Sequence, residues 1–541
     1  MEKNLKTIAD IYRYSTKEFN TRIWSFCADK ELSYTYGQFG KKCEELSELL
    51  YEHGIGAGDP VAIYSSSTPH WPLAFFTATA FGRVSVPILR DFSGIEAEHV
   101  LKHSESRVLF VGKQQLSRLS EECLSSLDLV FDIDSLEIIR SNAGGKINKE
   151  RHEPQPNDLA ALIYTSGTTG QAKGVMLTHI NFVTNVIAGF YIHTIGPKDT
   201  LLSILPLAHT YELSLGMLYP FASGAKVCYI SKAPTPSYLV KVMANVHPTA
   251  MLTVPLIIEK VYKGQILPTI KKSPVLRWMN RNMNSMLCRI VGRQLIKKFG
   301  GKMRFFGIGG AKLDVDVESF LNKARFPYFI GYGLTECAPL LAISSYKNTI
   351  PGSIGTQVHG VELRLDNINK ATGEGEIVAR GNNIMTGYYK DPERTAEAFT
   401  EDGWFRTKDI ATVDSKGRYT IRGRLGNMIL GANGENIYPE EIEKVIAEFP
   451  DVVESIVISR DNRLLALVRV NPDAINLNSE LLDEKMKVIV ESYKKRLMDY
   501  VNTRVNINSK IHTVELMVQP FVKTATLKIR RFLYAKDAPS V

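Results

Sequence analysis

A glycine-rich segment at residues 164–174 (YTSGTTGQAKG) carries the residue types that hold phosphate. It contains four serine or threonine hydroxyls, three glycines and one lysine. Glycine lets backbone N–H groups turn toward an anion at positive φ, the hydroxyls donate further hydrogen bonds, and Lys173 adds a positive charge. The spacing disfavours a Walker A motif, because Lys173 is followed by Gly174 rather than by serine or threonine. The segment predicts a phosphate-binding loop, with a solvated hairpin tip as the alternative on composition alone.

Apolar runs of strand length lie on both sides of this loop. Residues 159–164 precede it and residues 175–177 follow it, so the loop should connect two strands. Helical patterns separate further runs of the same kind at 60–64, 84–88, 108–111, 160–164, 226–230 and 303–308. This alternation predicts α/β layers with largely parallel sheets.

The pattern changes twice toward the C-terminus. After Val358, short strands broken by glycine turns predict an antiparallel, barrel-like module. After Gly423, strand patterns at 455–459 and 464–470 and a helix at about 479–501 predict a small α+β domain. We therefore expect a large N-terminal domain over residues 1–423 and a small mobile C-terminal domain over residues 424–541.

The composition is that of an ordinary globular protein, with 44% apolar and 23% charged residues over 541 positions. The six cysteines form no CxxC pair and have no histidine cluster beside them, which disfavours a disulfide framework or a zinc site and favours a reducing compartment. The N-terminus lacks an apolar stretch of signal-peptide length, and no apolar run reaches 18 residues. These features predict a cytoplasmic protein.

The net charge of +9 comes from one segment. Residues 260–304 hold twelve Lys or Arg and no Asp or Glu, which leaves 54 basic and 57 acidic residues elsewhere. Ser273, Pro274 and the pair Gly300–Gly301 are typical helix boundaries, so a basic amphipathic helix should run over 274–299. Its apolar residues recur at helical spacing (Leu276, Met279, Met283, Met286, Leu287 and Ile290). The helix docks on the core with a solvated charged side or contacts anionic lipid at the inner membrane face; nucleic acid is disfavoured because no aromatic interleaving accompanies the charge.

Four further motifs follow the loop in order. They are FFGIGGA (305–311), GYGLTE (331–336), GWFRTKD (403–409) and GRLGNMILGANGENIYPEEIE (423–443). Together with YTSGTTGQAKG, at these intervals, they resemble the ANL superfamily of adenylate-forming enzymes, which includes acyl-CoA synthetases, peptide-synthetase adenylation domains and luciferases. The resemblance spans nearly the whole chain.

The resemblance implies a two-step reaction. A carboxylic acid is first joined to the α-phosphate of ATP with release of pyrophosphate, and AMP then leaves as a thiol attacks. Cations and N–H donors carry such chemistry, because they neutralise charge on the phosphate oxygens. The resemblance assigns the β- and γ-phosphates to the loop, with Thr165, Ser166, Gly167, Thr168, Thr169, Gly170 and Lys173 as its binding residues.

The resemblance also assigns roles to the later motifs. Thr335 would bind the α-phosphate, and Glu336 would hold magnesium, a hard cation that suits carboxylate and phosphate oxygens. The adenine would stack on Tyr332 against a wall of backbone, and Asp409 would accept hydrogen bonds from the ribose hydroxyls. The remaining ATP-binding residues implied are Gly309, Gly310, Ala311, Gly333 and Arg424. Seen alone, Glu336 or Asp409 would be interpreted as an ordinary surface charge.

The C-terminal domain would supply the catalytic lysine and a thiol channel. The segment 522–531 (VKTATLKIRR) matches the family's catalytic lysine at Lys528, which swings in to the α-phosphate and the acyl carboxylate. The loop 431–436 (GANGEN) would replace it in the second step, with Gly431 and Gly434 letting the pantetheine arm of CoA pass close to the backbone. An ordinary glycine turn is the alternative for this loop.

Two positions depart from the family pattern, and three details suggest a subtype. Lys408 stands where the family usually has glycine before the ribose aspartate, and Gly426 stands where it usually has Asp or Lys at the hinge. The subtype details are LPLAHTYE (205–212), LGANGENIYPEEIE and the ending TLKIRR, with Leu527 where many relatives have glycine. They look like the long-chain fatty acyl-CoA synthetases. His209 would then lie by the acyl pocket, or serve as a hydrogen-bonded structural histidine.

Three functions are compatible with these motifs. The first is a magnesium-dependent ligase that makes fatty acyl-CoA from a fatty acid, ATP and CoA. The second uses an acyl carrier protein as acceptor, with the basic helix as its docking surface. The third is a nucleotide-binding regulatory protein in which Lys408 and Gly426 mark lost catalysis.

Overall fold

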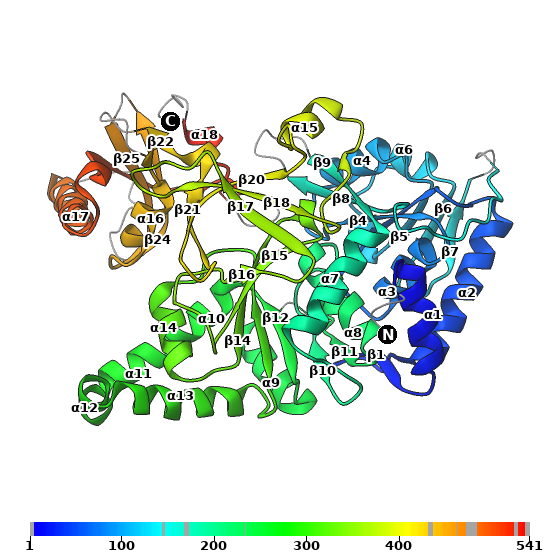
Figure 1. Cartoon of the computed structure of the whole chain (residues 1–541), viewed down its shortest axis with the longest axis horizontal. Coiled ribbons are helices and arrows are strands. Elements are labelled where there is room, and N and C mark those ends of the chain that lie inside the picture. The colour runs from blue at the N-terminus through cyan, green and yellow to red at the C-terminus, as the bar shows by residue number, and fades with distance from the viewer. Residues whose placement is uncertain are drawn as a thin grey trace.

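The computed structural model describes residues 5–142, 147–166, 172–232, 234–430, 436–460, 463–471, 484–523 and 529–535. Two large sheets form the main body, helices pack around them, and the C-terminal elements gather at one end (Figure 1). The predicted mixed α/β fold is confirmed.

The first large sheet carries the glycine-rich loop. Its strands are β3 (Pro60–Tyr64), β4 (Val84–Ile88), β5 (Val108–Val111), β6 (Leu129–Asp132), β7 (Ile138–Ser141), β8 (Leu159–Ser166), β9 (Ala172–Thr178) and β19 (Gly387–Tyr388). They lie in the order β19-β9-β8-β4-β3-β5-β6-β7. The strands from β8 to β6 pair in parallel, whereas β8 and β9 pair antiparallel on either side of the loop. The prediction that the loop connects two strands is therefore confirmed.

The second large sheet carries the GIGGA and GYGLTE motifs. Its strands are β1 (Ile23–Cys27), β2 (Ser33–Thr35), β10 (Thr200–Leu202), β11 (Lys226–Tyr229), β12 (Ala250–Thr253), β13 (Phe305–Ile308), β14 (Tyr328–Gly333), β15 (Leu340–Ser345) and β16 (Thr356–Gln357). They lie in the order β16-β15-β14-β13-β12-β10-β11-β1-β2. The strands β1, β10, β11, β12, β13 and β14 form one parallel set, so the chain leaves β13 and β14 at the same edge. This parallel pairing brings the two motifs side by side.

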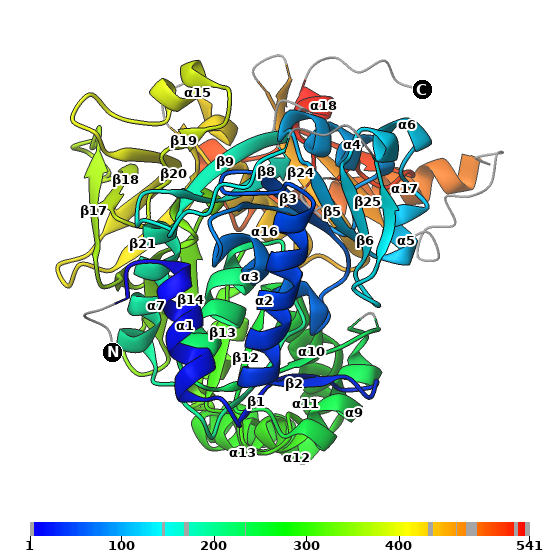
Figure 2. The same ribbon diagram turned by 90° about the vertical axis from the view of Figure 1, so that its right-hand side faces the viewer.

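Helices and aromatic side chains join the two sheets. The α-helices described between residues 5 and 222 are α1 (Ile8–Glu18), α2 (Tyr36–Glu52), α3 (His70–Thr79), α4 (Gly94–His103), α5 (Lys113–Leu116), α6 (Glu121–Ser125), α7 (His179–Ile192) and α8 (Tyr219–Ala222). Most of them are labelled in Figure 2. Phe221 packs its ring 4.6 Å from Phe76 and 4.7 Å from Trp24, centroid to centroid. Phe221, Phe76 and Trp24 are fully buried, so this contact fixes α3 and α8 against β1.

The basic region folds into two helices rather than one. α12 (Pro274–Asn282) begins with Ser273 as its N-cap, whose hydroxyl accepts from Leu276 N at 3.3 Å. α13 (Asn284–Lys298) ends at Gly300 and Gly301, both at positive φ. The predicted boundaries are confirmed, but the prediction of one helix is wrong, because Met283 has φ −137° and ψ 41° and interrupts it. The neighbouring helices are α9 (Pro236–Val246), α10 (Pro255–Val261), α11 (Leu267–Lys272) and α14 (Val315–Lys323).

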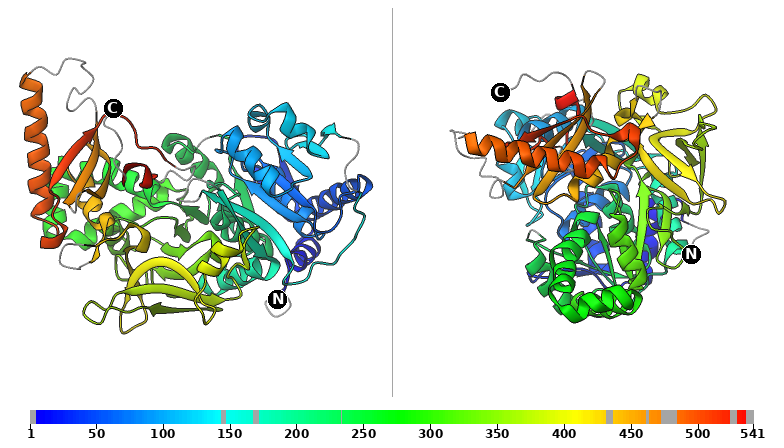
Figure 3. Two further views of the ribbon diagram at one scale, coloured as in Figure 1. Left: turned by 90° about the horizontal axis from the view of Figure 1, so that it is seen from above. Right: turned by 90° about the vertical axis from the view of Figure 1, so that its left-hand side faces the viewer.

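The C-terminal third contains three smaller sheets among the described residues. β17 (Val361–Asp366), β18 (Gly375–Gly381), β20 (Phe405–Val413) and β21 (Tyr419–Arg424) form the predicted antiparallel module, and α15 (Pro392–Glu397) lies beside it. The last unit contains β22 (Ile429–Leu430), β23 (Asn436–Ile437), α16 (Pro439–Ala447), β24 (Val452–Arg460), β25 (Arg463–Val470), α17 (Glu484–Asn502), β26 (Thr513–Met517) and α18 (Phe532–Ala535). It has its own core around Ile442, Leu497 and Val501 (Figure 3). The three sheets have the strand orders β17-β18-β20-β21, β22-β23 and β24-β25-β26. A domain boundary at residues 423–424 remains our proposal.

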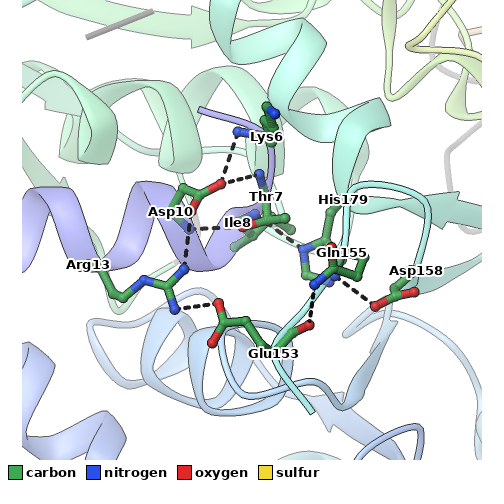
Figure 4. A network of polar contacts seen from close by, with 9 residues as sticks. All are labelled: Lys6, Thr7, Ile8, Asp10, Arg13, Glu153, Gln155, Asp158 and His179. Carbon is green, nitrogen blue, oxygen red and sulfur yellow. Dashed lines mark hydrogen bonds and ion pairs between the residues drawn. The ribbon is translucent and has the colours of Figure 1, made fainter. Parts of the chain in front are cut away.

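The N-terminal helix pins the base of the hairpin formed by β8 and β9 (Figure 4). His179 directly follows β9, and its Nδ1 accepts a hydrogen bond from Ile8 N at 3.2 Å. Burial lowers the pKa of His179 to about 4, which keeps the ring neutral and able to accept. His179 N donates to the carbonyl of Asp158, directly before β8, at 3.1 Å. Arg13 bonds Glu153 on the segment that leads into β8. Both ends of the hairpin are thus fixed to α1.

Candidate active site

The described ends of the phosphate loop leave one buried hydroxyl without a partner. Thr165 lies near the end of β8, in register with Lys173 on β9. Among the described residues nothing bonds its Oγ1, although that atom is buried. An unpaired buried hydroxyl costs about 1–3 kcal/mol, so Thr165 fits a site that a ligand completes. Gly167, Thr168, Thr169 and Gly170 lie outside the described residues, and only the backbone of Ser166 is described.

Lys173 and Glu336 form an ion pair across the site. The Lys173 ammonium lies 3.3 Å from Glu336 Oε1, and it donates to the Tyr388 hydroxyl at 2.7 Å. Tyr388 donates to the same carboxylate oxygen at 2.9 Å. Burial, followed by the adjacent Glu336 carboxylate, raises the pKa of Tyr388 well above its ordinary value, so the phenol stays a donor. Lys173, Glu336 and Tyr388 thus place one cation and one carboxylate beside the phosphate loop.

Tyr332, Asp409 and Arg424 form a second polar cluster. Tyr332 donates to Asp409 Oδ2 at 2.7 Å, and Arg424 Nε donates to Asp409 Oδ1 at 3.0 Å. Burial alone would lower the pKa of Arg424, whereas the negative charge of Asp409 raises it. On balance the pKa of Arg424 is raised. Each carboxylate oxygen keeps a lone pair for another donor, so Asp409 can still accept hydroxyls from a ligand. Thr335 opens the turn that joins this cluster to Glu336.

Side-chain amides hold the turn after β14 in place. Asn185 and Asn383 both donate to the carbonyl of Cys337, at 3.0 and 3.2 Å. Gly333 lies so close to the next segment that a Cβ there would meet the Pro339 carbonyl at 1.8 Å. Any side chain at Gly333 would displace the turn and move Glu336 with it.

The GIGGA turn presents backbone next to an aromatic ring. A Cβ on Gly309 would lie 3.1 Å from the ring of Tyr211, and Gly310 has φ +84°. Tyr211 is half-buried and packs on the main core. Glycine thus lets the backbone lie close against Tyr211, and Ala311 follows on an exposed turn.

Lys408, one of the two positions that depart from the motif pattern, has a left-handed backbone conformation. Its φ is +60°, in the left-handed region. Its N–H donates to Glu376 Oε1 at 3.1 Å, while its side chain is exposed. The next residue, Asp409, is bonded through its own N–H to Thr407 Oγ1 at 3.1 Å. The substitution thus leaves Asp409 in bonding position and concentrates the backbone strain at Lys408.

His209 lies in the loop before an irregular helix that buries a carboxyl. His209 is half-buried, and its carbonyl accepts from Leu213 N at 2.9 Å. Glu212 opens the π-helix η2 (Glu212–Leu218), is fully buried, and accepts from Ser203 Oγ at 2.5 Å. Burial raises the pKa of Glu212 to about 8. Gly216 leaves room for this carboxyl, since a Cβ there would lie 2.7 Å from the Glu212 carboxyl carbon.

The residues assigned to the C-terminal domain are only partly described. Lys528, Gly431 and Gly434 lie outside the described residues. Gly426 lies in the short 3-10 helix Leu425–Asn427, and a Cβ there would meet no atom within 4 Å. Among the described residues, none lies close enough to require glycine at position 426.

Tyr388, which contacts both Lys173 and Glu336, belongs to none of the sequence motifs. Tyr388 lies 215 residues after Lys173, and the two meet because β19 pairs with β9. No spacing signal reveals a contact made by such a pairing. Within the described ranges, no three His, Cys, Asp or Glu side chains gather into a group that could hold a metal ion.

The fold and site together define an adenylate-forming enzyme, and comparison with known proteins places the chain in a family. Residues 14–389 match the family described as AMP-binding enzyme, and the chain belongs to that family. The resemblance found in the motifs is thereby confirmed.

Two relatives illustrate the similarity in sequence. The chain is 31% identical over 488 residues to long chain acyl-CoA synthetase 6, peroxisomal, of Arabidopsis thaliana, which covers 82% of this chain and 69% of the relative. It is 30% identical over 462 residues to long-chain-fatty-acid–CoA ligase FadD15 of Mycobacterium tuberculosis, and the match covers 79% of this chain and 75% of the relative.

Solved structures share the fold over nearly the whole length. ATP-bound MatB from Rhodopseudomonas palustris superposes with a TM-score of 0.77 at 20% identity, covering 98% of both chains. O-succinylbenzoate coenzyme A synthetase from Bacillus subtilis, in complex with ATP and magnesium ion, superposes with a TM-score of 0.75 at 20% identity. The superposition covers 96% of this chain and 98% of that structure. None of the helices in the described ranges is long and apolar enough to cross a membrane.

Proposed function

We propose that the chain is an AMP-forming fatty acid–CoA ligase with a long-chain substrate. The observation that carries the proposal is the pairing of Lys173 with Glu336 beside Asp409 with Arg424, in a chain about 30% identical to enzymes named for long-chain acyl-CoA synthesis. The first step couples the fatty acid carboxylate to the α-phosphate of ATP and releases pyrophosphate. In the second step the CoA thiol attacks the acyl carbon and AMP leaves.

The residues divide this work between phosphate and ribose. On this proposal Lys173, Thr165 and the loop bind the β- and γ-phosphates, and Thr335 donates to the α-phosphate. Asp409 accepts the ribose hydroxyls, with Arg424 and Tyr332 holding its orientation. Lys173 and Thr335 would neutralise charge on the phosphate oxygens, while Asp409 would fix the position of the nucleotide.

Glu336 fits the role of a magnesium ligand. It is 8% exposed, and a single carboxylate beside phosphates is the usual protein contribution to such a site. Magnesium bound there would neutralise charge on the phosphate oxygens. Lys173 and Tyr388 keep the Glu336 carboxylate oriented toward the site through the two short contacts to Oε1.

The acceptor thiol is a separate question from the adenylation. An acyl carrier protein is the second candidate, because the basic region could receive an acidic partner. A nucleotide-binding protein without catalysis is disfavoured, since the relatives are named as synthetases and ligases and Lys408 leaves Asp409 bonded in place. On this proposal the enzyme works in the cytoplasm.

The test is AMP release from ATP across fatty acids of graded length. The proposal expects release that needs both a long-chain acid and CoA, with no product when a carrier protein is the only thiol. Product with the carrier protein alone would favour the second candidate. Failure of every acid to drive exchange of pyrophosphate into ATP would contradict both enzymatic functions.

A further inference from the structure

The outward faces of α12 and α13 combine basic and apolar side chains. We call this surface the α12–α13 face. Its apolar members are Val275, Trp278, Met283, Met286 and Ile290, and its basic members are Arg277, Arg281, Arg289, Arg293 and Lys297. The exposed fractions of Trp278 and Val275 are 58% and 66%, and those of Met286 and Ile290 are 50% and 40%. Large apolar side chains are thus left in water beside arginines.

The structure changes the amphipathic pattern expected from the sequence. Of the apolar residues that recur at helical spacing, Leu287 is the one that α13 buries among the described side chains. The buried side of α13 is Leu287, Cys288, Gly292 and Leu295, which leaves Met286 and Ile290 on the outward side with Arg289 and Arg293. Met286 and Ile290 therefore lie in solvent, because the narrow contact with α9 and α14 buries another side of the helix.

The basic residues of this face have no carboxylate partner within the described chain. None of the five forms an ion pair there, whereas Lys263 and Arg304, at the flanks of the basic segment, pair with Asp314 and Asp199. Since residues 260–304 contain no Asp or Glu, the positive charge is not neutralised locally. Such a surface attracts an anionic partner from outside the chain.

The two helices run along one edge of the molecule, away from α15 and α18 (Figures 1 and 2). With a rise of 1.5 Å per residue, their 9 and 15 residues extend over roughly 13 Å and roughly 22 Å. The α12–α13 face is therefore long enough to contact an extended partner. A membrane surface is flat and extended, which a small acidic protein is not.

The side-chain types match a phospholipid interface. The planar guanidinium of arginine binds phosphate oxygens through paired N–H groups, and tryptophan prefers the boundary between headgroups and acyl chains. Basic helices with large apolar residues lie in that boundary with their apolar side chains inserted. Nucleic acid fits less well, because Val275, Met286 and Ile290 offer no stacking surface.

We propose that the α12–α13 face docks on membranes rich in anionic phospholipid, with Trp278 and Met286 inserted and the arginines on headgroup phosphates. The docking is independent of the ligase reaction, because Arg289 and Arg293 lie on an edge of the fold and contact none of the site residues described above.

Vesicle sedimentation of the full chain tests the proposal. We expect binding to phosphatidylcholine vesicles that contain phosphatidylglycerol, loss of binding in about 0.5 M salt, and little binding to phosphatidylcholine alone. The double variant R289E/R293E should bind about tenfold or more weakly. The matched control K17E/K370E makes the same change in net charge at exposed positions elsewhere, and it should bind like the unaltered chain.

Tryptophan fluorescence reports insertion directly. The chain has four tryptophans, and Trp24, Trp71 and Trp404 are buried, so a blue shift on adding anionic vesicles reports Trp278. W278F should lose the shift. Sedimentation without any shift, or equal weakening by the control variant, would overturn the proposal. So would capture of acyl carrier protein through Arg289 and Arg293 without vesicle binding. Pyrophosphate exchange with R289E/R293E checks that the variant is folded and keeps this result separate from the ligase proposal.

Discussion

The nucleotide site and the α12–α13 face use positive charge in opposite ways. In the site, Lys173 and Arg424 lie within 3.3 Å and 3.0 Å of a carboxylate each, and Glu336 and Asp409 are buried. On the face, Arg289, Arg293 and their neighbours are exposed and have no such partner in the described chain. Paired, buried charges hold a fixed geometry for a small ligand, whereas unpaired, exposed charges act at long range on an extended one.

The largest expected effect is at Lys528. If the site works by placing cations on the α-phosphate, Lys528→Ala abolishes formation of the acyl-adenylate. It leaves thioester formation from supplied adenylate partly intact, because the lysine is replaced in the second step. Separate assays of pyrophosphate release and of thioester formation check this. An equal loss in both half reactions would contradict the assignment.

Glu336→Gln should lower the rate of adenylation by about 10²-fold or more, because it removes the buried charge that faces Lys173 and the proposed magnesium. The rate of pyrophosphate exchange into ATP measures it. The matched control is Glu105→Gln, which breaks the exposed pair between Glu105 and Lys390 at 2.7 Å. Surface pairs contribute about 0–1 kcal/mol, so the control should be nearly silent. Equal effects of the two variants would erase the contrast between buried and exposed charge.

Glu212 shows what burial does to a carboxyl without a cation. Its folded pKa of about 8 lies above the ordinary 4.5, so the folded chain holds the proton more tightly than the unfolded chain. Stability should therefore be greatest below about pH 4.5 as far as this group is concerned, and should fall as pH rises toward 8, by about 3–5 kcal/mol. Urea unfolding between pH 5 and 9 measures the fall. Glu212→Gln should flatten it, and an unchanged slope in that variant would rule out this group as its origin.

The smallest effect is at Lys408, where the chain has lysine at φ +60°. A left-handed conformation costs a residue with a side chain about 1–2 kcal/mol, and Lys408→Gly removes that cost from the folded state. Glycine also raises the conformational entropy of the unfolded chain, which offsets part of the gain in stability. The net expectation is a stabilisation of about 0.5–1 kcal/mol with unchanged affinity for ATP. Lys416→Gly, at an exposed turn position without positive φ, should be neutral or destabilising. Thermal unfolding of the two variants compares them, and greater stabilisation by Lys416→Gly would contradict this account.

Much of the fold was predictable because its signals are local. The strands β3, β4 and β5 begin and end at the residues that the apolar runs indicated, since buried parallel strands are short and nearly continuous in apolar residues. The caps at Ser273 and Gly300 were readable for the same reason. The interruption at Met283 was not, because no glycine or proline marks it.

The sequence by itself determined the phosphate-loop motif, the family and the order of the elements, since each of these is written in residues close together along the chain. Tertiary structure alone decided which distant groups meet. Tyr388 reaches Lys173 and Glu336 only because β19 pairs with β9. Packing against α9 and α14 likewise decided that Met286 and Ile290 share the outward side of α13 with arginines. Helical periodicity defines the sides of a helix, but the neighbours that cover one of them decide which side remains in water.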